Sequence, residues 1–494
     1  MLQNKLFHYI QQFDRKEMTR FREFALSPYH FKHEDTRKLI ALLDKYYPNF
    51  NERNCDRKKL FQKLFPGQKH DQKQLALLFT YATRLLEKFL ITEELEESVA
   101  ENKILLLRKL RKLEQEKTYR KLYRKFKTKL DKKNFRDTHH YRFQFLLSDE
   151  ANLYPDFDRG SKKKPIIQIK QNSLDKYFMA EKLHDVCEMH VRSLLLNTTY
   201  DPGLIQGVED YLKHRIDDFL EVPAVYMYYH LYLLIVKDDE EKYHLLVEAL
   251  PKNESAFRKK ELQDFYNFLR NYCLLKTNQG HQKYLEEVFR LYKQQLETGL
   301  MLDNEGILAE WHYKNIITAG INLGDMDWVE QFIHDYKDKL HPDLRENAYS
   351  YNLANFYYAD EAYDKAQDLL LDVEYTDVRY SLNAKMLLLR IYYEKDEFMA
   401  LQSLLESSRL YVQRNKLISE EVKLRYYNFI KFARRVYNVQ NHVGYSADEK
   451  VARIINRIDE ELKKTQNIFF RSWLDEKIRE VKSGIGLESY VEQS

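Results

Sequence analysis

The side chains best suited to bind a metal ion are His184, Cys187 and His190, which follow one another at intervals of three residues. Imidazole nitrogens and thiolates are ligands that zinc prefers, and residues three apart lie on neighbouring turns of a helix. His184 and His190, however, point about 120° apart around a helix of 3.6 residues per turn, so the three side chains do not converge easily. Packing is the simpler interpretation, and a helical metalloenzyme is kept as a second alternative function.

Sequence motifs of catalysis are missing from the chain. It contains no G-x-S-x-G elbow, no G-x-x-x-x-G-K-[ST] loop and no H-E-x-x-H pair. Its 77 Asp and Glu residues lie at helical spacing beside Lys and Arg, which is typical of surface ion pairs rather than of an acid and base pair. We therefore predict no enzyme activity, no catalytic or metal-binding residue and no cofactor.

The strongest charge pattern lies in residues 103–136, which hold fifteen Lys or Arg and three acidic residues. Tyr119, Tyr123 and Leu130 keep an apolar stripe through this run, which predicts one amphipathic helix with cationic outer faces. Such a helix could neutralise phosphates while Tyr119 or Tyr123 stacks on bases. The other interpretation is a solvated face that pairs with acidic segments such as 93–101. The candidate nucleic-acid contacts are Arg108, Arg111, Lys112, Arg120, Lys121, Arg124, Lys125 and Lys127.

The composition predicts that helices position these residues. The chain has 494 residues, 44% hydrophobic and 32% charged, which is typical of a folded protein with more than one module. Glycine is scarce, at 12 residues, and none lies between Asp325 and Val443. Because parallel α/β enzymes need glycine in strand-to-helix turns, a nucleotide-binding sheet is not expected there. We predict an all-α fold.

Several features predict a soluble, cytoplasmic protein that does not cross a membrane. Cys55, Cys187 and Cys273 are too far apart to form the spaced disulfide framework of secreted proteins. The most apolar stretch, residues 225–236, is twelve residues long and contains His230, whereas a membrane span needs about 20 residues. The first residues lack the pattern of a secretory signal.

Charge, proline and helix-start signals divide the chain into four regions. Residues around 154–169 combine two prolines, a glycine and the triplet Lys162–Lys164, which is typical of a linker. We predict an N-terminal helical domain at 1–101, a basic amphipathic connector at 102–153, the linker at 154–169 and stacked helix pairs at 170–494, ending in capping helices.

Residues 351–370, YNLANFYYADEAYDKAQDLL, resemble a tetratricopeptide repeat. Ala354 and Tyr357 match its first helix, and Ala366 and Leu370 match its second. The resemblance covers about 305–413 and implies antiparallel helix pairs that stack side by side into an α-solenoid. Helical periodicity alone extends this prediction to the rest of 170–494.

Neighbouring repeats depart from the family pattern. In the preceding pair, Gly320 and Ile317 replace the Tyr and the small residue of the first helix, and Leu389 takes the place of the small residue in the following pair. Three further stretches are similar to pieces of an uncharacterised all-helical family that implies no activity: FREFALSPYH, KKLFQKLFPG and SLDKYFMAEKLHDVCE.

The tetratricopeptide resemblance also implies a binding site. In that family, side chains of the first helices line a concave groove that often clamps an extended peptide or its carboxylate, and Lys, Arg and Asn suit such a ligand. On this basis we predict a non-catalytic scaffold for a protein or peptide partner, with regulatory nucleic-acid binding as the alternative. The other interpretation is that these residues are ordinary polar side chains of the surface and packing tyrosines. The candidate groove residues are Lys314, Tyr351, Asn355, Tyr358, Arg390 and Tyr393.

Overall fold

The structure of the chain is a computed structural model. It describes residues 4–51, 53–154, 157, 165–196, 198–371, 378–415, 418–444 and 448–485. Within these residues the regular structure is helical apart from one antiparallel bridge between Leu302 and Leu308, which confirms the all-α prediction. No helix among them is long and apolar enough to cross a bilayer. The chain forms two compact units, Met1–Arg258 (unit 1) and Lys259–Ser494 (unit 2).

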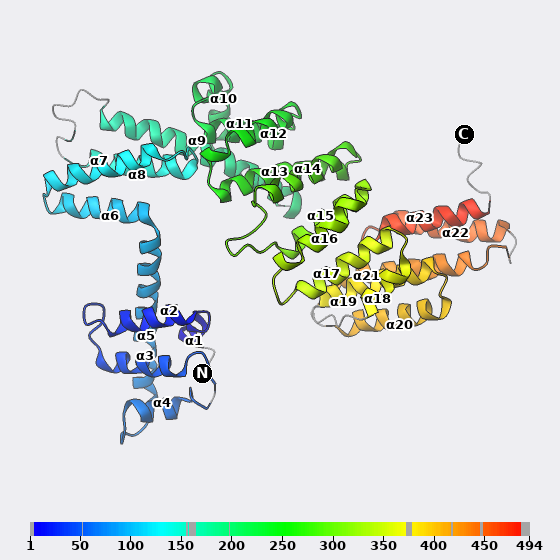
Figure 1. Cartoon of the computed structure of the whole chain (residues 1–494), viewed down its shortest axis with the longest axis horizontal. Helices are drawn as coiled ribbons and strands as arrows, with labels where there is room; N and C mark the ends of the chain where they lie inside the picture. Colours follow the sequence, from blue (N-terminus) through cyan, green and yellow to red (C-terminus); the bar gives the residue numbers. More distant parts are fainter. Residues whose placement is uncertain are drawn as a thin grey trace. The chain divides into compact units, whose positions relative to one another are not determined.

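The first helices of unit 1 surround a core of their own. Asp14 and Glu17 form the capping box that begins α2, and the side chain of Asp71 caps α5. The apolar face of α5 includes Leu78 and Leu85, which are buried against the other four helices. These elements are α1 (Lys5–Ile10), α2 (Arg15–Leu26), α3 (Glu34–Tyr46), α4 (Arg57–Leu64) and α5 (Gln72–Glu97), coloured blue in Figure 1.

The basic segment forms two helices, so the prediction of a single amphipathic helix over 103–136 is wrong. Its first helix ends at Lys112 and the second begins at Glu116, and Glu114 between them has a φ of 55°. No Gly or Pro marks this turn in the sequence. The two helices pack on each other and on α8 around a second core. They are α6 (Val99–Lys112), α7 (Glu116–Lys132) and α8 (Thr138–Asn152).

The remaining helices of unit 1 follow the predicted linker. Of residues 154–169, the stretches 155–156 and 158–164, with Lys162–Lys164, lie outside the described residues. Ile166, at the start of α9, is buried in the core that α6, α7 and α8 share. Helix α9 packs on both α8 and α11. The elements are α9 (Ile166–Leu196), α10 (Ile205–Lys213), η1 (Ile216–Phe219), α11 (Pro223–Lys237), α12 (Glu241–Lys252) and η2 (Glu254–Ala256).

Helices of the first part of unit 2 pack against their nearest neighbours in the chain. Each of α13, α15, α17 and α19 contacts the helix that follows it, and α17 contacts both α15 and α19. Gly320 permits one such contact, because a Cβ there would lie 2.3 Å from Val329 Cγ2 and 3.0 Å from the Phe289 ring. These elements are α13 (Lys259–Asn278), α14 (Lys283–Glu297), α15 (Glu310–Leu323), α16 (Met326–Asp335), η3 (Lys337–Lys339), α17 (Arg345–Ala359), α18 (Tyr363–Leu371), α19 (Val378–Glu394) and α20 (Phe398–Arg414).

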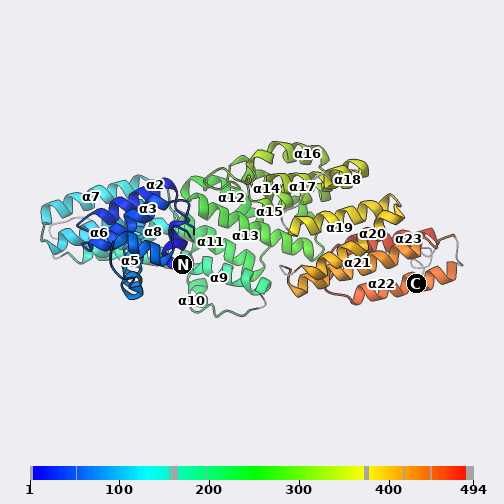
Figure 2. The ribbon, with the colours of Figure 1, turned by 90° about the horizontal axis from the view of Figure 1, so that it is seen from below.

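Three helices complete unit 2 at its C-terminal side. Helix α21 packs on α20, α22 and α23, as the orange and red ribbons of Figures 1 and 2 show. Trp473 and Leu474 of the last helix are buried in a core that α19, α20, α21 and α22 share with it. The elements are α21 (Glu420–Gln440), α22 (Asp448–Lys464) and α23 (Arg471–Gly484).

Candidate functional site

The predicted groove residues lie on three helices of unit 2 that contact one another in turn, α15, α17 and α19. The exposure and the contacts of these residues differ between α15 and α19. Lys314 is on α15, Tyr351, Asn355 and Tyr358 are on α17, and Arg390 and Tyr393 are on α19.

Lys314 is exposed, whereas the other five predicted groove residues are half-buried or buried. Its Nζ lies 6.0 Å from the centroid of the Tyr351 ring, a cation–π contact that joins α15 to α17. Tyr351 itself is 3% exposed and packs edge-on against Tyr380, with the ring centroids 5.8 Å apart. The charged group of Lys314 is therefore accessible to solvent beside the buried Tyr351 ring.

Trp311 lies one turn before Lys314 on the same face of α15 and was missed by the sequence interpretation. Its side chain is 61% exposed, which is unusual for so large an apolar group. Its spacing of three residues from Lys314 was a usable signal, but an aromatic residue on a repeat helix normally suggests packing. We call the exposed face formed by Trp311, Lys314, Asn315 and Thr318 the α15 surface.

Asn355 is half-buried and uses its amide within its own helix. Its Nδ2 donates a hydrogen bond of 3.0 Å to the backbone carbonyl of Tyr351. That bond is an internal one between turns of α17. The amide is thus not held ready for a peptide backbone, as the resemblance implied.

Tyr358 and Arg390 are held by the C-terminal part of unit 2. The Arg390 guanidinium carbon lies 4.7 Å from the ring centroids of both Tyr358 and Phe470. The Tyr358 hydroxyl donates to Glu394 Oε1 at 3.1 Å, and burial is the main cause that raises the pKa of this tyrosine. Arg390 is therefore a packing cation between two rings.

Tyr393 is a core residue. It is 2% exposed, and its ring packs edge-on against Trp473 of α23 at a centroid distance of 5.0 Å. The neighbouring Glu394 accepts hydrogen bonds from Trp473 Nε1 at 3.0 Å and from Lys477 Nζ at 2.8 Å. Helix α23 thus covers this end of the predicted groove, and Tyr351 and Tyr393 follow the packing interpretation.

The arginines of α6 are used inside unit 1. Glu150 of α8 is 2% exposed, and its carboxylate accepts from Arg111 Nε at 2.6 Å and lies 3.6 Å from Arg108 Nε. Tyr119 of α7 donates to the backbone carbonyl of Glu150 at 3.1 Å. This buried carboxylate ties the three helices together, so Arg108 and Arg111 are structural cations.

Two cations of α7 have partners as well, and its tyrosines are inaccessible. Arg120 pairs with Glu116 at 2.8 Å, and Lys127 pairs with Asp131 at 2.8 Å. Tyr119 and Tyr123 are buried in the core of α6, α7 and α8. The expectation that either ring stacks on nucleic-acid bases is therefore wrong.

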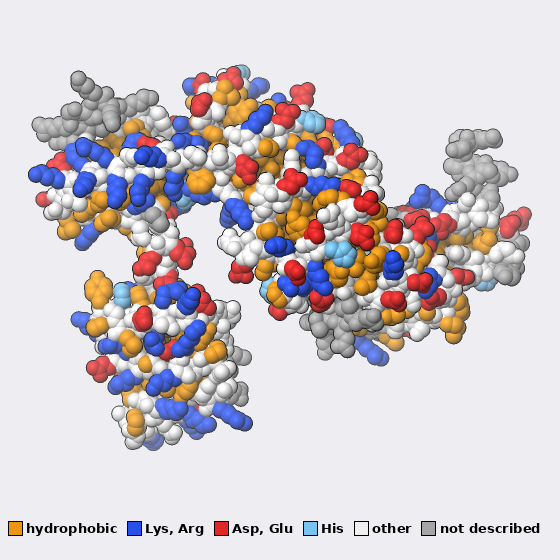
Figure 3. Space-filling view, in the orientation of Figure 1, with side chains coloured by type: hydrophobic (Ala, Val, Ile, Leu, Met, Phe, Trp, Pro, Cys, Tyr) orange, Lys and Arg blue, Asp and Glu red, His pale blue; other side chains and the backbone are white. Residues whose placement is uncertain are grey.

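An uncompensated row of cations nevertheless runs along the outer face of α7. Its members fall within about 100° of the helix circumference, opposite the buried stripe, and extend over about 22 Å. All are exposed, and among the described residues none has an ion-pair partner. Figure 3 shows blue side chains gathered along this helix. The α7 stripe consists of Lys117, Lys121, Arg124, Lys125 and Lys132, with exposed Lys112 at the end of α6.

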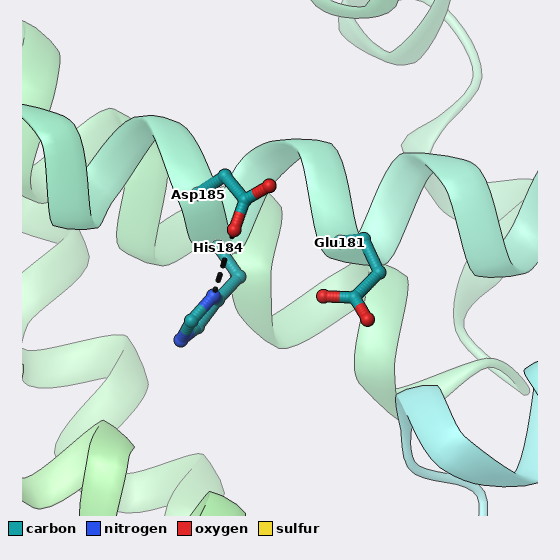
Figure 4. A group of neighbouring side chains, drawn as sticks. All are labelled: Glu181, His184 and Asp185. Carbon is teal, nitrogen blue, oxygen red and sulfur yellow. Dashed lines mark ion pairs between the residues drawn. The ribbon is translucent and has the colours of Figure 1, made fainter. Parts of the chain in front are cut away.

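Of His184, Cys187 and His190, which were considered as metal ligands and interpreted as packing residues, only His184 belongs to a group of potential ligands among the described residues. Cys187 is completely buried, which raises the pKa of its thiol and makes it a core residue. His184 instead lies beside Glu181 and Asp185 on α9, where potential ligand atoms of the three approach within 4.8 Å. Two of these three residues form an ion pair, in which His184 Nδ1 lies 3.5 Å from Asp185 Oδ1 (Figure 4). Burial is the main cause that raises the pKa of Glu181.

Comparisons with models of known families, with characterised proteins and with solved structures find no match for this chain. The interpretation of its function therefore rests on the residues and contacts described above.

Proposed function

We propose that this chain is a non-catalytic binding protein whose α15 surface contacts a protein or peptide partner. The observation that carries the proposal is the exposed pair Trp311 and Lys314, one turn apart on the same helix face. Exposed tryptophan beside an uncompensated cation is the composition of binding hot spots, because the ring supplies apolar area and the cation supplies orientation.

The chemistry of this pair favours an extended acidic segment. Lys314 has no ion-pair partner among the described residues, and the nearby Glu310 accepts a hydrogen bond from the Tyr380 hydroxyl at 3.2 Å, so a carboxylate of the partner could pair with Lys314. Trp311 would cover a large apolar side chain on the same segment. The arrangement of α15, α17 and α19, each in contact with the next such helix, supports a tetratricopeptide-like stack that presents these helices on one face.

The test is selection of dodecapeptides against the immobilised full chain, followed by fluorescence polarisation on the selected peptides. We expect the selected peptides to share an acidic residue near a large apolar one. Trp311→Ala and Lys314→Glu should each weaken binding at least about tenfold, or 1.4 kcal/mol. The matched controls are Lys260→Glu and Met399→Ala, which change an exposed lysine and a 78% exposed methionine elsewhere on unit 2. Failure to enrich any peptide, or equal losses in the controls, would contradict the proposal.

A second candidate function, binding of a nucleic-acid duplex, is favoured by the α7 stripe. Because Tyr119 and Tyr123 are buried, such binding would use phosphates and not base stacking. A row of cations extending over about 22 Å suits the backbone of one strand.

The duplex proposal predicts a steep dependence of affinity on salt. Five phosphate contacts imply a slope of about −4.5 in log K against log salt, or roughly a 500-fold loss between 50 and 200 mM. The triple variant K121E/R124E/K125E should flatten this slope by more than half. The triple variant K259E/K260E/K283E, at exposed lysines of unit 2, is the control. A slope near zero for the unmodified chain would exclude the candidate.

A further inference from the structure

A cavity of about 300 Å³ lies within unit 1 where α6, α7 and α8 meet. Its wall combines cations with aromatic rings from different helices. Lys103 comes from the first half of α6, Lys129 comes from the last turn of α7, and Lys133 follows directly after α7. None of these lysines belongs to the α7 stripe, and Lys129 lies about 40° around α7 from Lys125 at the edge of that stripe.

None of the three lysines of the cavity has an ion-pair partner among the described residues, although Glu97 and Glu101 also line the wall. Burial, with Lys129 and Lys133 as the next causes, lowers the pKa of Lys103. The cavity therefore brings like charges together, an arrangement that costs free energy unless an anion enters.

Two of the three acids at or beside the cavity, Asp137 and Glu101, have partners of their own. Asp137 is fully buried and is ion-paired with Arg258. Glu101 accepts a hydrogen bond from the Ser98 hydroxyl and lies 3.9 Å from Arg142. Glu97 is exposed at the rim. The lysines thus keep a net positive field in the cavity.

A buried imidazole lines the same cavity without a partner. His140 is 4% exposed, and its Nδ1 has no hydrogen-bond partner. A polar atom buried in this way normally costs free energy, so native proteins rarely leave one unsatisfied.

Aromatic rings form the apolar part of the wall. Phe126, Phe135 and Phe143 line the cavity, and Lys103 Nζ lies 5.4 Å from the Phe126 ring centroid. A site of this size accepts a small ligand, and its rings suit a flat apolar body. The lysines suit a phosphate, which they bind as point charges.

We propose that this cavity binds a small organic phosphate with a flat ring system, of about the size of a mononucleotide. The phosphate contacts Lys103, Lys129 and Lys133, and the ring lies among the phenylalanines. The site is independent of the α15 surface, because it lies entirely within unit 1.

The test is calorimetric titration of the full chain with AMP, adenosine and inorganic phosphate. We expect AMP to bind at least tenfold more tightly than either of the others, since only AMP has both the phosphate and the ring. Lys133→Gln and Lys103→Gln should weaken AMP binding at least tenfold. Lys121→Gln, on the α7 stripe, is the matched control and should leave AMP affinity unchanged.

A stability measurement separates binding from a merely structural role. Removing the charge of exposed Lys133 relieves repulsion on Lys103, so K133Q without ligand should unfold at the same temperature as the unmodified chain or higher. AMP should raise the unfolding temperature of the unmodified chain but not that of K133Q. Absence of AMP binding, equal binding of adenosine or of phosphate, or an effect of K121Q equal to that of K133Q would overturn the proposal.

Discussion

At the scale of single residues, the exposure of a side chain decides whether it can act on a partner. In the sequence, Lys314 and Arg390 were both predicted to be cations of the groove, each on the first helix of a repeat. In the structure Lys314 is exposed, whereas Arg390 lies between the rings of Tyr358 and Phe470. The distinction depends on Phe470, which is 80 residues away in sequence, so no local pattern could reveal it.

His312, next to Trp311 on α15, makes the stability of unit 2 sensitive to acid. Burial, aided by Arg270, lowers the pKa of His312 to about 4. Its Nδ1 is buried without a partner. An unfolded chain binds this proton below about pH 6.5, so the free energy of unfolding should fall as pH drops from 6.5 towards 4. Protonation of His312 should account for about 2 kcal/mol of the decrease in the free energy of unfolding between pH 7 and pH 5.

Urea unfolding at both pH values checks this prediction. The three tryptophans, Trp311, Trp328 and Trp473, all lie in unit 2, so their fluorescence reports unit 2 alone. Between pH 7 and pH 5, the free energy of unfolding of unit 2 should fall by about 2 kcal/mol less in His312→Leu than in the unmodified chain. His341→Asn, which removes a half-exposed imidazole from the same unit, is the control. An unchanged pH dependence in His312→Leu would show that this histidine is not the cause.

At the scale of elements, some helix starts carry a local signal in the sequence. Asp14 with Glu17, and Asp71, are residue types that cap helices, and in the structure they cap α2 and α5. The turn between α6 and α7 escaped prediction, because Glu114 adopts a left-handed conformation without the glycine that usually signals it. The sequence also did not reveal that Arg108 and Arg111 pair with Glu150, because this residue is about forty residues away on α8.

Close packing between α15 and its neighbours predicts that Gly320 is essential to unit 2. A Cβ at this position would lie 2.3 Å from Val329 Cγ2, and β-branched valine cannot move that atom far. Overpacking costs typically 1–3 kcal/mol, while Ala gains about 1 kcal/mol of helix propensity over Gly. Gly320→Ala should therefore destabilise unit 2 by up to about 2 kcal/mol in urea unfolding followed by tryptophan fluorescence.

Two further variants isolate the cause of that loss. The double variant G320A/V329A should show a smaller cost of G320A than the single variant, because the clashing methyl is gone. In α10, nothing lies within 4 Å of a Cβ added at Gly207. Gly207→Ala should therefore leave the stability of unit 1 unchanged or raise it, as followed by circular dichroism. Equal effects of Gly320→Ala and Gly207→Ala would contradict close packing at Gly320.

At the scale of the whole molecule, the sites proposed for two kinds of binding chemistry lie in different units. Unit 1 holds the α7 stripe and the lysine-lined cavity, whereas unit 2 holds the α15 surface. Composition predicted the all-helical fold and the basic segment. It could not predict which cations remain unpaired, because that depends on acids brought close only by folding, such as Glu150 and Asp137.

The most direct test of partner binding is hydrogen exchange of the full chain with and without a selected acidic peptide. Binding at the α15 surface should slow the exchange of backbone amides in α15 and in the facing part of α17, where Lys314 lies over Tyr351. Trp311→Ala should abolish this protection while the amides of α7 remain unchanged in both samples. Protection that appears only in other helices, or that persists in Trp311→Ala, would contradict the assignment of the α15 surface as the binding site.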